Sequence, residues 1–270
     1  MTFFKKTDQE MRDSKTFINN SEKSNKVGSI LQRTGPGKRI PTGIPGFDNL
    51  IEGGFKYNSI VLVEGGAGTG KSIFSLQYIY NGITKFNENG IYISFEEEKK
   101  DFYDNMSRFG WDMEKLEKEK KFTYLRYQPE QVEKVLSSGG GIIRDAVDAI
   151  NAKRIVIDSI TAFTLLHEDE LSKREAVLTL FRVVKKWGCT TLVIGQPQLL
   201  GDDEKHPFNI LEFECDGVVR LYHKIEHNIR QRNLEVYKMR GTNHAEKMFT
   251  MEISENGIIS YPDSNSMWFI

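Results

Sequence analysis

The chain lacks the segments that would carry it into or across a membrane. No apolar run approaches the roughly 20 residues that a bilayer-spanning helix needs. Residues 1–6 read Met-Thr-Phe-Phe-Lys-Lys and polar residues follow, so the apolar core of a signal peptide is missing. Of the two cysteines, Cys189 and Cys215, Cys189 lies beside an apolar run, which predicts a buried thiol rather than a disulfide partner or nucleophile. We therefore expect a cytoplasmic protein that engages no membrane.

An excess of charge of one sign is also lacking. The 37 lysines and arginines balance 38 aspartates and glutamates, for a formal net charge of −1. The chain therefore has no global cationic field that would hold nucleic acid. With 28% charged and 39% hydrophobic residues, the composition is typical of a globular protein. A length of 270 residues suffices for one large α/β domain with a short appendage.

Apolar strands alternate with amphipathic helical segments after a polar N-terminal stretch. Residues 1–37 are rich in Lys, Asn, Ser and Thr, which predicts a flexible arm, or a loosely docked helix, that ends near Gly35-Pro36-Gly37. The pattern predicts strands at 59–63, 90–95, 122–125, 154–158 and 190–195, and helices at 73–83, 99–109, 142–150 and 171–187. This alternation predicts a mostly parallel α/β sheet with helices on both faces. Short strands at 217–221, 233–237 and 247–251 predict an antiparallel C-terminal extension.

A glycine-rich loop joins the first of these strands to the first helix. It fits the P-loop pattern G-x-x-x-x-G-K-[ST] with Gly65, Gly66, Ala67, Gly68, Thr69, Gly70, Lys71 and Ser72. Glycines let backbone N–H groups turn inward around a phosphate, and the helix N-terminus adds partial positive charge. In this motif Lys71 reaches the β- and γ-phosphates and the Ser72 hydroxyl binds Mg²⁺. The loop predicts a nucleotide site that takes ATP with Mg²⁺.

Three acidic residues at strand ends are candidates for the chemistry. Asp158 closes an apolar strand that we expect beside the P-loop strand, where it would hold Mg²⁺ together with Ser72; the alternative is a cap for the next segment. Glu96 and Glu97 follow another strand, and one of them would activate water as a general base, with Glu96 slightly favoured. The alternative is an acidic cluster in the first turn of a helix, which fits Glu98 best.

Two further polar groups have open interpretations. Gln196 closes the strand at 190–195 and could contact the γ-phosphate, or could simply end the strand. Lys238 and Arg240 are two positions apart, so in a strand they would point to one face, as suits a phosphate. The alternative is an exposed strand edge protected by charge.

Several motifs in a fixed order connect this chain with a known family. They are R-I-P-T-G-I-P-G-F-D at 39–48 followed by Gly53-Gly54, the P-loop, the pair after Phe95, R-F-G-W-D at 108–112, I-D-S at 157–159 and K-M-R-G-T-N-H at 238–244. In this order and spacing the chain resembles the KaiC-like ATPases of the RecA superfamily. The resemblance covers roughly residues 39–262. We accordingly expect an arm at 1–37, an ATPase domain at 38–262 and a tail at 263–270.

The resemblance implies a RecA-type fold that assembles into homo-oligomeric rings, usually hexamers, with ATP between subunits. One subunit would supply the P-loop, Glu96, Glu97 and Asp158, and its neighbour would supply residues in trans. These trans residues are Lys238 and Arg240 as finger residues at the γ-phosphate, with Thr242 and His244 near the nucleotide. Arg108 falls where the family contacts the adenosine end. Hydrolysis would then depend on assembly.

Three departures from the clock protein KaiC narrow the function. KaiC carries two such domains in tandem, and this chain has one. Where the autophosphorylating half of KaiC has a Ser-Thr pair, this sequence reads E-F-E-C at 212–215, without a hydroxyl. Gln196 also stands in a G-Q-P-Q context more like that of recombinases. The sequence thus predicts an ATPase without autokinase activity and does not support a clock role.

Three functions remain open from the sequence. The leading hypothesis is an ATP-hydrolysing regulatory switch that acts on an unknown protein partner. The alternative is a DNA-repair ATPase of the RecA/RadA-paralogue type that binds single-stranded DNA. The acidic stretch at 202–204 argues against this alternative, and the cations between Arg220 and Arg232 argue weakly for it. A third reading is an ATP-binding scaffold with negligible turnover, against which the intact Glu96-Glu97 pair argues.

Overall fold

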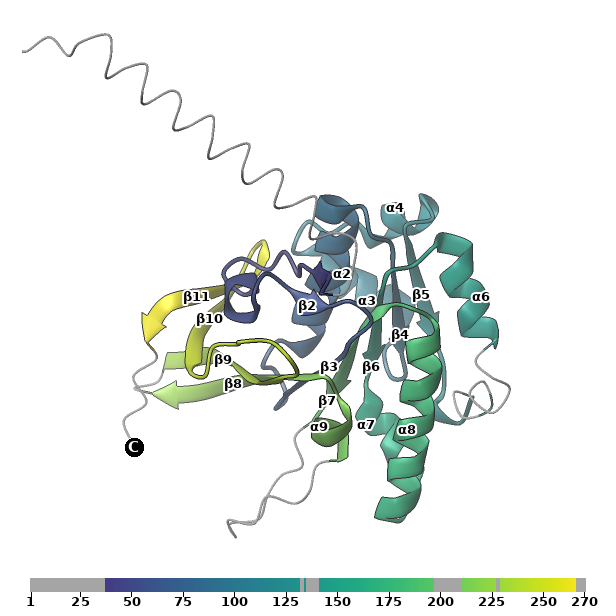
Figure 1. The fold of residues 1–270 in the computed structure, drawn as a ribbon. Coiled ribbons are helices and arrows are strands. Elements are labelled where there is room, and N and C mark those ends of the chain that lie inside the picture. The colour runs from purple at the N-terminus through teal and green to yellow at the C-terminus, as the bar shows by residue number, and fades with distance from the viewer. Residues whose placement is uncertain (1–36, 132–133, 135–140, 197–209, 227–228, 266–270) are drawn as a thin grey trace, which may run out of the picture. The chain divides into compact units, whose positions relative to one another are not determined.

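The computed structural model describes residues 37–131, 134, 141–196, 210–226 and 229–265 (Figure 1). The predicted arm at 1–37 lies almost entirely outside the described residues. Its predicted boundary and the boundary at 262 stay predictions. Among the described residues, no helix is both long and apolar enough to span a bilayer.

The helices and strands alternate along the chain much as the sequence pattern predicts. The strands are β1 (Arg39–Ile40), β2 (Phe55–Lys56), β3 (Ile60–Gly65), β4 (Gly90–Ser94), β5 (Phe122–Arg126), β6 (Arg154–Asp158), β7 (Thr190–Gly195), β8 (Gly217–Glu226), β9 (Ile229–Met239), β10 (Met248–Ser254) and β11 (Gly257–Asn265). The helices are the 3₁₀ helix η1 (Asp48–Ile51), α2 (Lys71–Phe86), α3 (Lys99–Ser107), α4 (Met113–Lys118), α6 (Gly141–Ile150), α7 (Ile160–Thr164), α8 (Glu170–Lys186) and α9 (Ile210–Glu214).

One nine-stranded sheet organises the domain, in the order β11-β10-β9-β8-β3-β7-β6-β4-β5. The six strands from β8 to β5 run parallel, and β9, β10 and β11 extend the sheet antiparallel. This confirms the predicted fold class. The antiparallel extension begins one strand later than the sequence predicts, because β8, which opens with the segment at 217–221, pairs parallel to β3.

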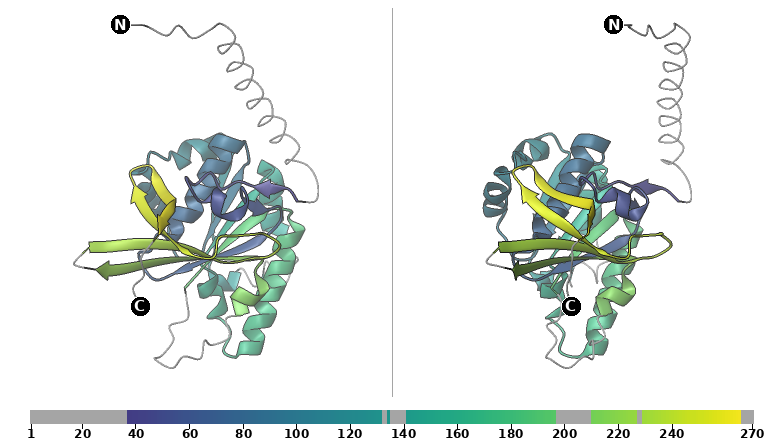
Figure 2. Two further views of the ribbon diagram at one scale, coloured as in Figure 1. Left: turned by 60° about the vertical axis from the view of Figure 1, so that its left-hand side comes forward. Right: turned by 90° about the vertical axis from the view of Figure 1, so that its left-hand side faces the viewer.

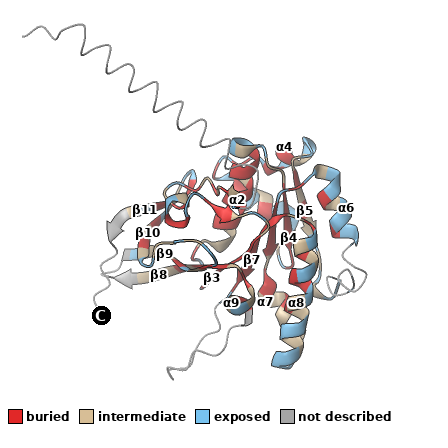
Figure 3. Ribbon diagram, in the orientation of Figure 1, coloured by how far each residue is buried: buried red, intermediate tan, exposed pale blue. Residues whose placement is uncertain are grey.

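The core divides into two clusters, one on each face of the sheet (Figures 1 and 3). Alternate residues of β3 serve the two faces: Val61 and Val63 pack with α2, α3 and α4, whereas Ile60 and Leu62 pack with α6, α7 and α8. Because β3 is covered on both faces, its sequence is a nearly continuous apolar run rather than an alternating one. This central position fixes the loop that follows β3.

The hairpin of β8 and β9 is longer than the sequence pattern indicates. β8 spans ten residues and β9 eleven, whereas β10 pairs with only four residues of β9, from Arg232 to Glu235. Figure 2 shows the two strands running on past the β10–β11 pair. A bulge between Val218 and Val219 shifts the pairing of this hairpin, so Tyr237 has no residue opposite it.

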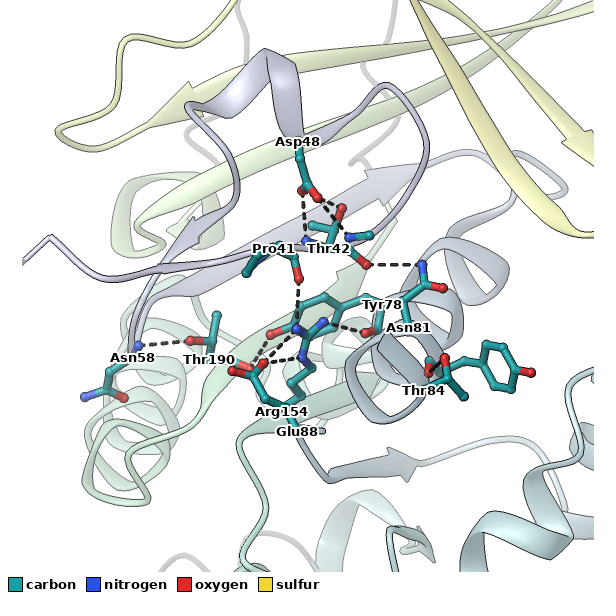
Figure 4. A network of polar contacts seen from close by, with 12 residues as sticks. Pro41, Thr42, Asp48, Asn58, Tyr78, Asn81, Thr84, Glu88, Arg154 and Thr190 are labelled. Atoms are coloured by element: carbon teal, nitrogen blue, oxygen red, sulfur yellow. Dashed lines mark hydrogen bonds and ion pairs between the residues drawn. The ribbon is translucent and has the colours of Figure 1, made fainter. Parts of the chain in front are cut away.

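A buried arginine ties four segments together at the start of β6 (Figure 4). The Arg154 guanidinium binds the Glu88 carboxylate, with Nη2 at 2.7 Å from Oε2, and donates to the carbonyl oxygens of Tyr78 and Pro41. Its Cζ also lies 4.5 Å from the centre of the Tyr78 ring. Strand β6, helix α2 and the segment that enters the domain are thereby fixed to one another.

Candidate functional site

The loop at 66–70 turns sharply between β3 and α2, and its glycines permit the turn. Gly68 and Gly70 have φ of 75° and 105°, which L side chains rarely adopt. A Cβ at Gly65 would lie 2.4 Å from the Leu221 carbonyl oxygen, so β8 leaves no room there for a side chain. At Gly66 a Cβ would meet open space, so an approaching group meets bare backbone.

The N-terminus of α2 opens directly onto this loop. Gly70 is the N-cap residue of α2, and no side-chain cap hydrogen bond is present in the described structure. The first N–H groups of the helix therefore remain available for an anion. The Lys71 ammonium donates to the carbonyl oxygens of Gly65 and Gly66 at 2.8 and 2.9 Å. Burial lowers the pKa of Lys71, while the nearby carboxylates of Asp158 and Glu96 oppose that shift. The loop thus combines a cation and a helix N-terminus.

Asp158 reaches the first turn of α2 although its strand is not adjacent to β3. Strand β7 lies between β3 and β6, so the prediction that the Asp158 strand lies beside the P-loop strand is wrong. Asp158 Oδ2 accepts hydrogen bonds from Ser72 Oγ at 3.0 Å and from the Tyr92 hydroxyl at 2.5 Å. Burial raises the pKa of Asp158, and these two hydrogen bonds oppose the shift. The carboxylate and hydroxyl oxygens that the sequence predicts as Mg²⁺ ligands therefore lie side by side.

The two candidate bases after β4 have different surroundings. The Ser94 hydroxyl accepts from the backbone N–H groups of Glu96 and Glu97, which fixes the turn that carries both. Glu96 is exposed and its Oε1 accepts from Ser159 Oγ at 3.1 Å, directly beside Asp158. Glu97 is half-buried and accepts from Asn105 at 2.8 Å, and burial raises its pKa. Only Glu96 is bound to the segment that follows β6.

The other predicted residues, Gln196, Glu98 and Arg108, contact neighbouring segments of the chain. The Gln196 backbone N–H donates to the Thr161 hydroxyl at 2.9 Å, which joins the end of β7 to α7. Glu98 is the N-cap residue of α3, and its carboxylate pairs with Arg126 at 3.1 Å. The Arg108 guanidinium lies 4.6 Å from the centre of the Phe109 ring at the end of α3. A role for Arg108 at adenosine and for Gln196 at the γ-phosphate stays a prediction.

The finger segment, residues 238–244, lies at the other end of the sheet. Val61 near the start of β3 pairs with Gly217, which pairs with Met239, whereas Gly65 at the end of β3 pairs with Leu221. Four residues at about 3.3 Å each separate the two positions, or about 13 Å along the strand. The structure therefore does not bring the finger segment to the P-loop of the same chain.

Within the finger segment the two cations bind backbone oxygens of α9. Lys238 Nζ donates to the Glu212 and Phe213 carbonyl oxygens at 2.6 and 3.2 Å. Arg240 Nη2 donates to the Phe213 carbonyl oxygen at 2.5 Å, and Nη1 lies 4.0 Å from Asp216 Oδ1. Elsewhere in the segment, the Arg240 N–H donates to the Asp216 carbonyl at 2.7 Å, the Thr242 N–H donates to the Met239 carbonyl, and His244 Nδ1 lies 3.2 Å from the Ala245 carbonyl.

A family model described as the KaiC-type ATPase matches residues 40–265 of this chain. The chain belongs to the KaiC ATPase family. The match spans β1 to β11 and includes the glycine loop, Asp158, Glu96 and the finger segment. The RecA-like P-loop fold that the sequence predicts is thus confirmed.

Curated relatives and a solved structure agree with this assignment. A UPF0273 protein of Methanocaldococcus jannaschii is 36% identical over 244 residues, which cover 84% of this chain and 97% of that protein. The circadian clock oscillator protein KaiC of Prochlorococcus marinus is 36% identical over 233 residues, which cover 83% of this chain but 45% of the clock protein. The crystal structure of a KaiC-like protein from Pyrococcus horikoshii superposes with a TM-score of 0.72 at 38% identity, and the match covers 83% of this chain and 99% of that one.

The residues in place fit a nucleotide with a divalent cation. The uncapped helix N-terminus, bare glycine backbone and Lys71 suit a phosphate chain. No group of three or more His, Cys, Asp or Glu side chains among the described residues is arranged to hold a metal ion. One carboxylate beside one hydroxyl suits Mg²⁺, which takes few protein ligands when phosphates supply the rest.

Several residues of this KaiC-family site were not found by reading the sequence. Tyr92 and Ser94 come from β4, where an apolar run conceals them, and Asn105 comes from α3. Ile253 lies near the β10–β11 turn, 3.0 Å from where Gly70 would carry a Cβ, so that turn borders the loop. The sequence did offer one signal of a further buried contact. Glu64 is a carboxylate in the otherwise apolar strand β3, and a buried carboxylate requires a partner.

Proposed function

We propose that this KaiC-family ATPase binds Mg²⁺-ATP at residues 65–72 and hydrolyses it in a head-to-tail homo-oligomer, with a hexameric ring favoured. Each subunit contributes the finger segment to the site of its neighbour. The assembled ring acts as a cytoplasmic regulatory switch on a protein partner. The proposal rests on the family assignment and on the separation of the two halves of the site within one chain.

The phosphate half of the site is complete in each subunit. The N–H groups at the start of α2 and the Lys71 ammonium would bind the β- and γ-phosphates. Ser72 and Asp158 would hold Mg²⁺, which supplies charge neutralisation at the phosphate oxygens when bound. Tyr92 holds the Asp158 carboxylate in place for that task. These residues account for binding, and they are supplied by one chain.

The nucleophilic water needs a base at the open side of the γ-phosphate. Glu96 suits that role better than Glu97, because Ser159 holds its carboxylate beside Asp158 while the residue stays exposed. Asn105 directs the Glu97 carboxylate towards α3 instead. Water activated by Glu96 would attack in line with the leaving oxygen.

The finger residues carry the argument for a shared site. Charge that develops on the transferred phosphoryl group needs cations placed in advance. Lys238 and Arg240 lie at the amino end of β3, whereas the P-loop follows its carboxyl end. A head-to-tail neighbour would bring the two ends together across an interface, and repetition of that contact closes a ring.

Hydrolysis rather than self-phosphorylation is the proposed reaction. The segment at 212–215 offers only carboxylates, a phenyl ring and a thiol, and Cys215 is fully buried. Glu212 and Glu214 are engaged with Arg220 and Arg174. We therefore propose an ATPase without autokinase activity at this segment.

A mixing experiment tests the shared site directly. Lys71→Ala disables the phosphate half of a subunit, and Arg240→Ala disables the finger half, so each variant alone should form rings without turnover. Mixed in equal amounts and reassembled, they should recover about a quarter of wild-type turnover, because about one interface in four joins an intact P-loop to an intact finger segment. An inactive mixture, or an active Arg240→Ala ring, would show that the fingers do not act in trans.

A further inference from the structure

A buried carboxylate adjoins the first glycine of the P-loop. Glu64 is the penultimate residue of β3, and its side chain is 3% exposed. Burial raises the pKa of Glu64, and the Arg220 guanidinium opposes that shift. A carboxylate in this position is costly unless it is paired, so its partner is fixed by energetics as well as geometry.

That partner, Arg220, connects two carboxylates from different parts of the chain. Its Nε lies 2.5 Å from Glu64 Oε1, and its Nη2 lies 2.9 Å from Glu212 Oε1 on α9. Its Cζ also stacks 3.4 Å from the centre of the Tyr237 ring, directly before Lys238. A planar guanidinium can form this bridge and stack at once, which a lysine ammonium cannot.

Helix α9 binds both Arg220 and the two cations of the finger segment. The carbonyl oxygens of Glu212 and Phe213 accept from Lys238 and Arg240, so the position of α9 sets where these two cations are held. The Glu212 carboxylate meanwhile binds Arg220. A continuous chain of contacts therefore leads from Glu64 beside the P-loop, through Arg220 and α9, to the finger segment.

We propose that Arg220 is a positioning residue that couples the phosphate site of a subunit to the finger segment that the same subunit presents to its neighbour. Nucleotide at the P-loop shifts β3 and Glu64, Arg220 passes the displacement to α9 through Glu212, and α9 moves the cations that it holds. Occupancy of one site thus sets the activity of the next. This inference rests on the proposed trans role of Lys238 and Arg240.

The test uses Glu212→Gln, which removes the α9 carboxylate that binds Arg220 and leaves the Glu64–Arg220 pair intact. Glu214→Gln is a matched control: it lies on the same short helix, is equally half-buried, and loses an ion pair of similar length, to Arg174 of α8. Each variant is assembled with ATP and Mg²⁺, and turnover is measured as a function of ATP concentration. Urea unfolding is measured in parallel.

The coupling predicts a selective loss in Glu212→Gln. Its kcat should fall about 2- to 30-fold, which is the range for substitutions along a coupling path, while the ATP concentration at half-saturation stays within twofold. Wild-type turnover should rise cooperatively with ATP, and Glu212→Gln should respond hyperbolically. Glu214→Gln should keep the wild-type kcat and cooperativity. Arg220→Lys should reproduce Glu212→Gln, because it keeps a charge for Glu64 but cannot bridge.

Three outcomes would overturn the coupling: an unchanged kcat in Glu212→Gln, an equal loss in both variants, or a hyperbolic wild-type response. Equal losses would mean that α9 only needs to be docked. Arg240→Ala, run beside them, separates the two levels of the argument. If Arg240→Ala is inactive while Glu212→Gln resembles wild type, the coupling fails and the shared site stands. If Arg240→Ala turns over normally, the proposed function itself fails.

Discussion

The orientation of the Asp158 carboxylate depends on the buried Tyr92 as well as on Ser72 of the P-loop. Tyr92 and Ser72 both donate to the same oxygen, Oδ2, so the rotation of the carboxylate is fixed. Tyr92 is itself fully buried and its ring packs against Phe102 and Tyr124. The position of the proposed Mg²⁺ ligand is therefore set by the aromatic core beneath it.

Replacing Tyr92 by Phe should weaken Mg²⁺ without disturbing the fold. The ring is retained, but Asp158 loses a hydrogen bond that orients it, so we expect the Mg²⁺ concentration for half-maximal turnover to rise about 10-fold or more. ATP affinity measured without Mg²⁺ should not change. Tyr103→Phe, which loses a hydroxyl bonded to Glu117, is the control. An unchanged Mg²⁺ dependence in Tyr92→Phe would argue against Asp158 as a metal ligand.

The buried thiol of Cys189 predicts a pH effect on stability. Burial raises the pKa of Cys189 from 9.0 to about 11. Because the folded pKa is the higher one, the stability from the neutral thiol is complete below pH 9 and is lost as pH rises towards 11. Between these values the free energy of unfolding of wild type should fall by about 2 kcal/mol more than that of Cys189→Ala. Urea titrations at several pH values would measure this, and parallel slopes would contradict it.

Residues that follow a strand could be predicted, and residues that support them could not. Lys71, Ser72 and Asp158 were recognisable because each stands beside an apolar run in a local pattern. Tyr92 and Arg220 act on partners 66 and 156 positions away, so their roles depend on strand order and register. A pattern of apolar residues carries no information about which strands become neighbours.

At the scale of elements, the strand–loop–helix units were predictable and the strand pairings were not. The periodicity places β4, β6 and β7 within a residue of their observed bounds, because each is a continuous buried run. Helices α4, α7 and α9 have five or six residues and were missed, since one turn or two gives too little periodicity. The order that places β7 between β3 and β6 was likewise beyond the pattern.

The cluster around Arg154 makes an element-scale prediction about stability. Its guanidinium is fully buried, so Glu88→Gln leaves a buried charge with its carboxylate partner gone. We expect a loss of about 3 kcal/mol in the free energy of unfolding, measured with urea. Glu119→Gln, which breaks an exposed pair with Lys121, should cost far less, because solvent screens that pair. Similar losses in the two variants would show that the Arg154 cluster is not a buried clamp.

Helix α2 is fitted to the same cluster by a glycine. A Cβ at Gly82 would lie 2.4 Å from Cδ and Nε of Arg154. The side chain has no room to withdraw, because it is bound to Glu88, Tyr78 and Pro41. The gain in helix propensity on changing Gly to Ala is only about 1 kcal/mol, so the clash should dominate in Gly82→Ala.

At the scale of the whole molecule, a shared site makes activity depend on concentration. Dilution below the assembly range should lower turnover per subunit, because an isolated subunit lacks the cations of its neighbour. Light scattering with and without ATP would report assembly on the same samples. Turnover per subunit that stays constant while the scattering mass falls to that of one chain would contradict the proposal.

The separation of the two ends of β3 has a genetic consequence. If the site is shared as proposed, a subunit with a defective finger segment would keep its own phosphate site and would silence the site next to it. In a cell that carries both wild-type and Arg240→Ala copies, about half of the interfaces would contain an intact finger segment, so some wild-type P-loops would be silenced while some variant P-loops would work. Lys71→Ala copies would still lend their fingers to wild-type neighbours, and the two alleles together would complement each other in part. Because the P-loop and the finger segment lie at opposite ends of β3, mutations in one would complement mutations in the other.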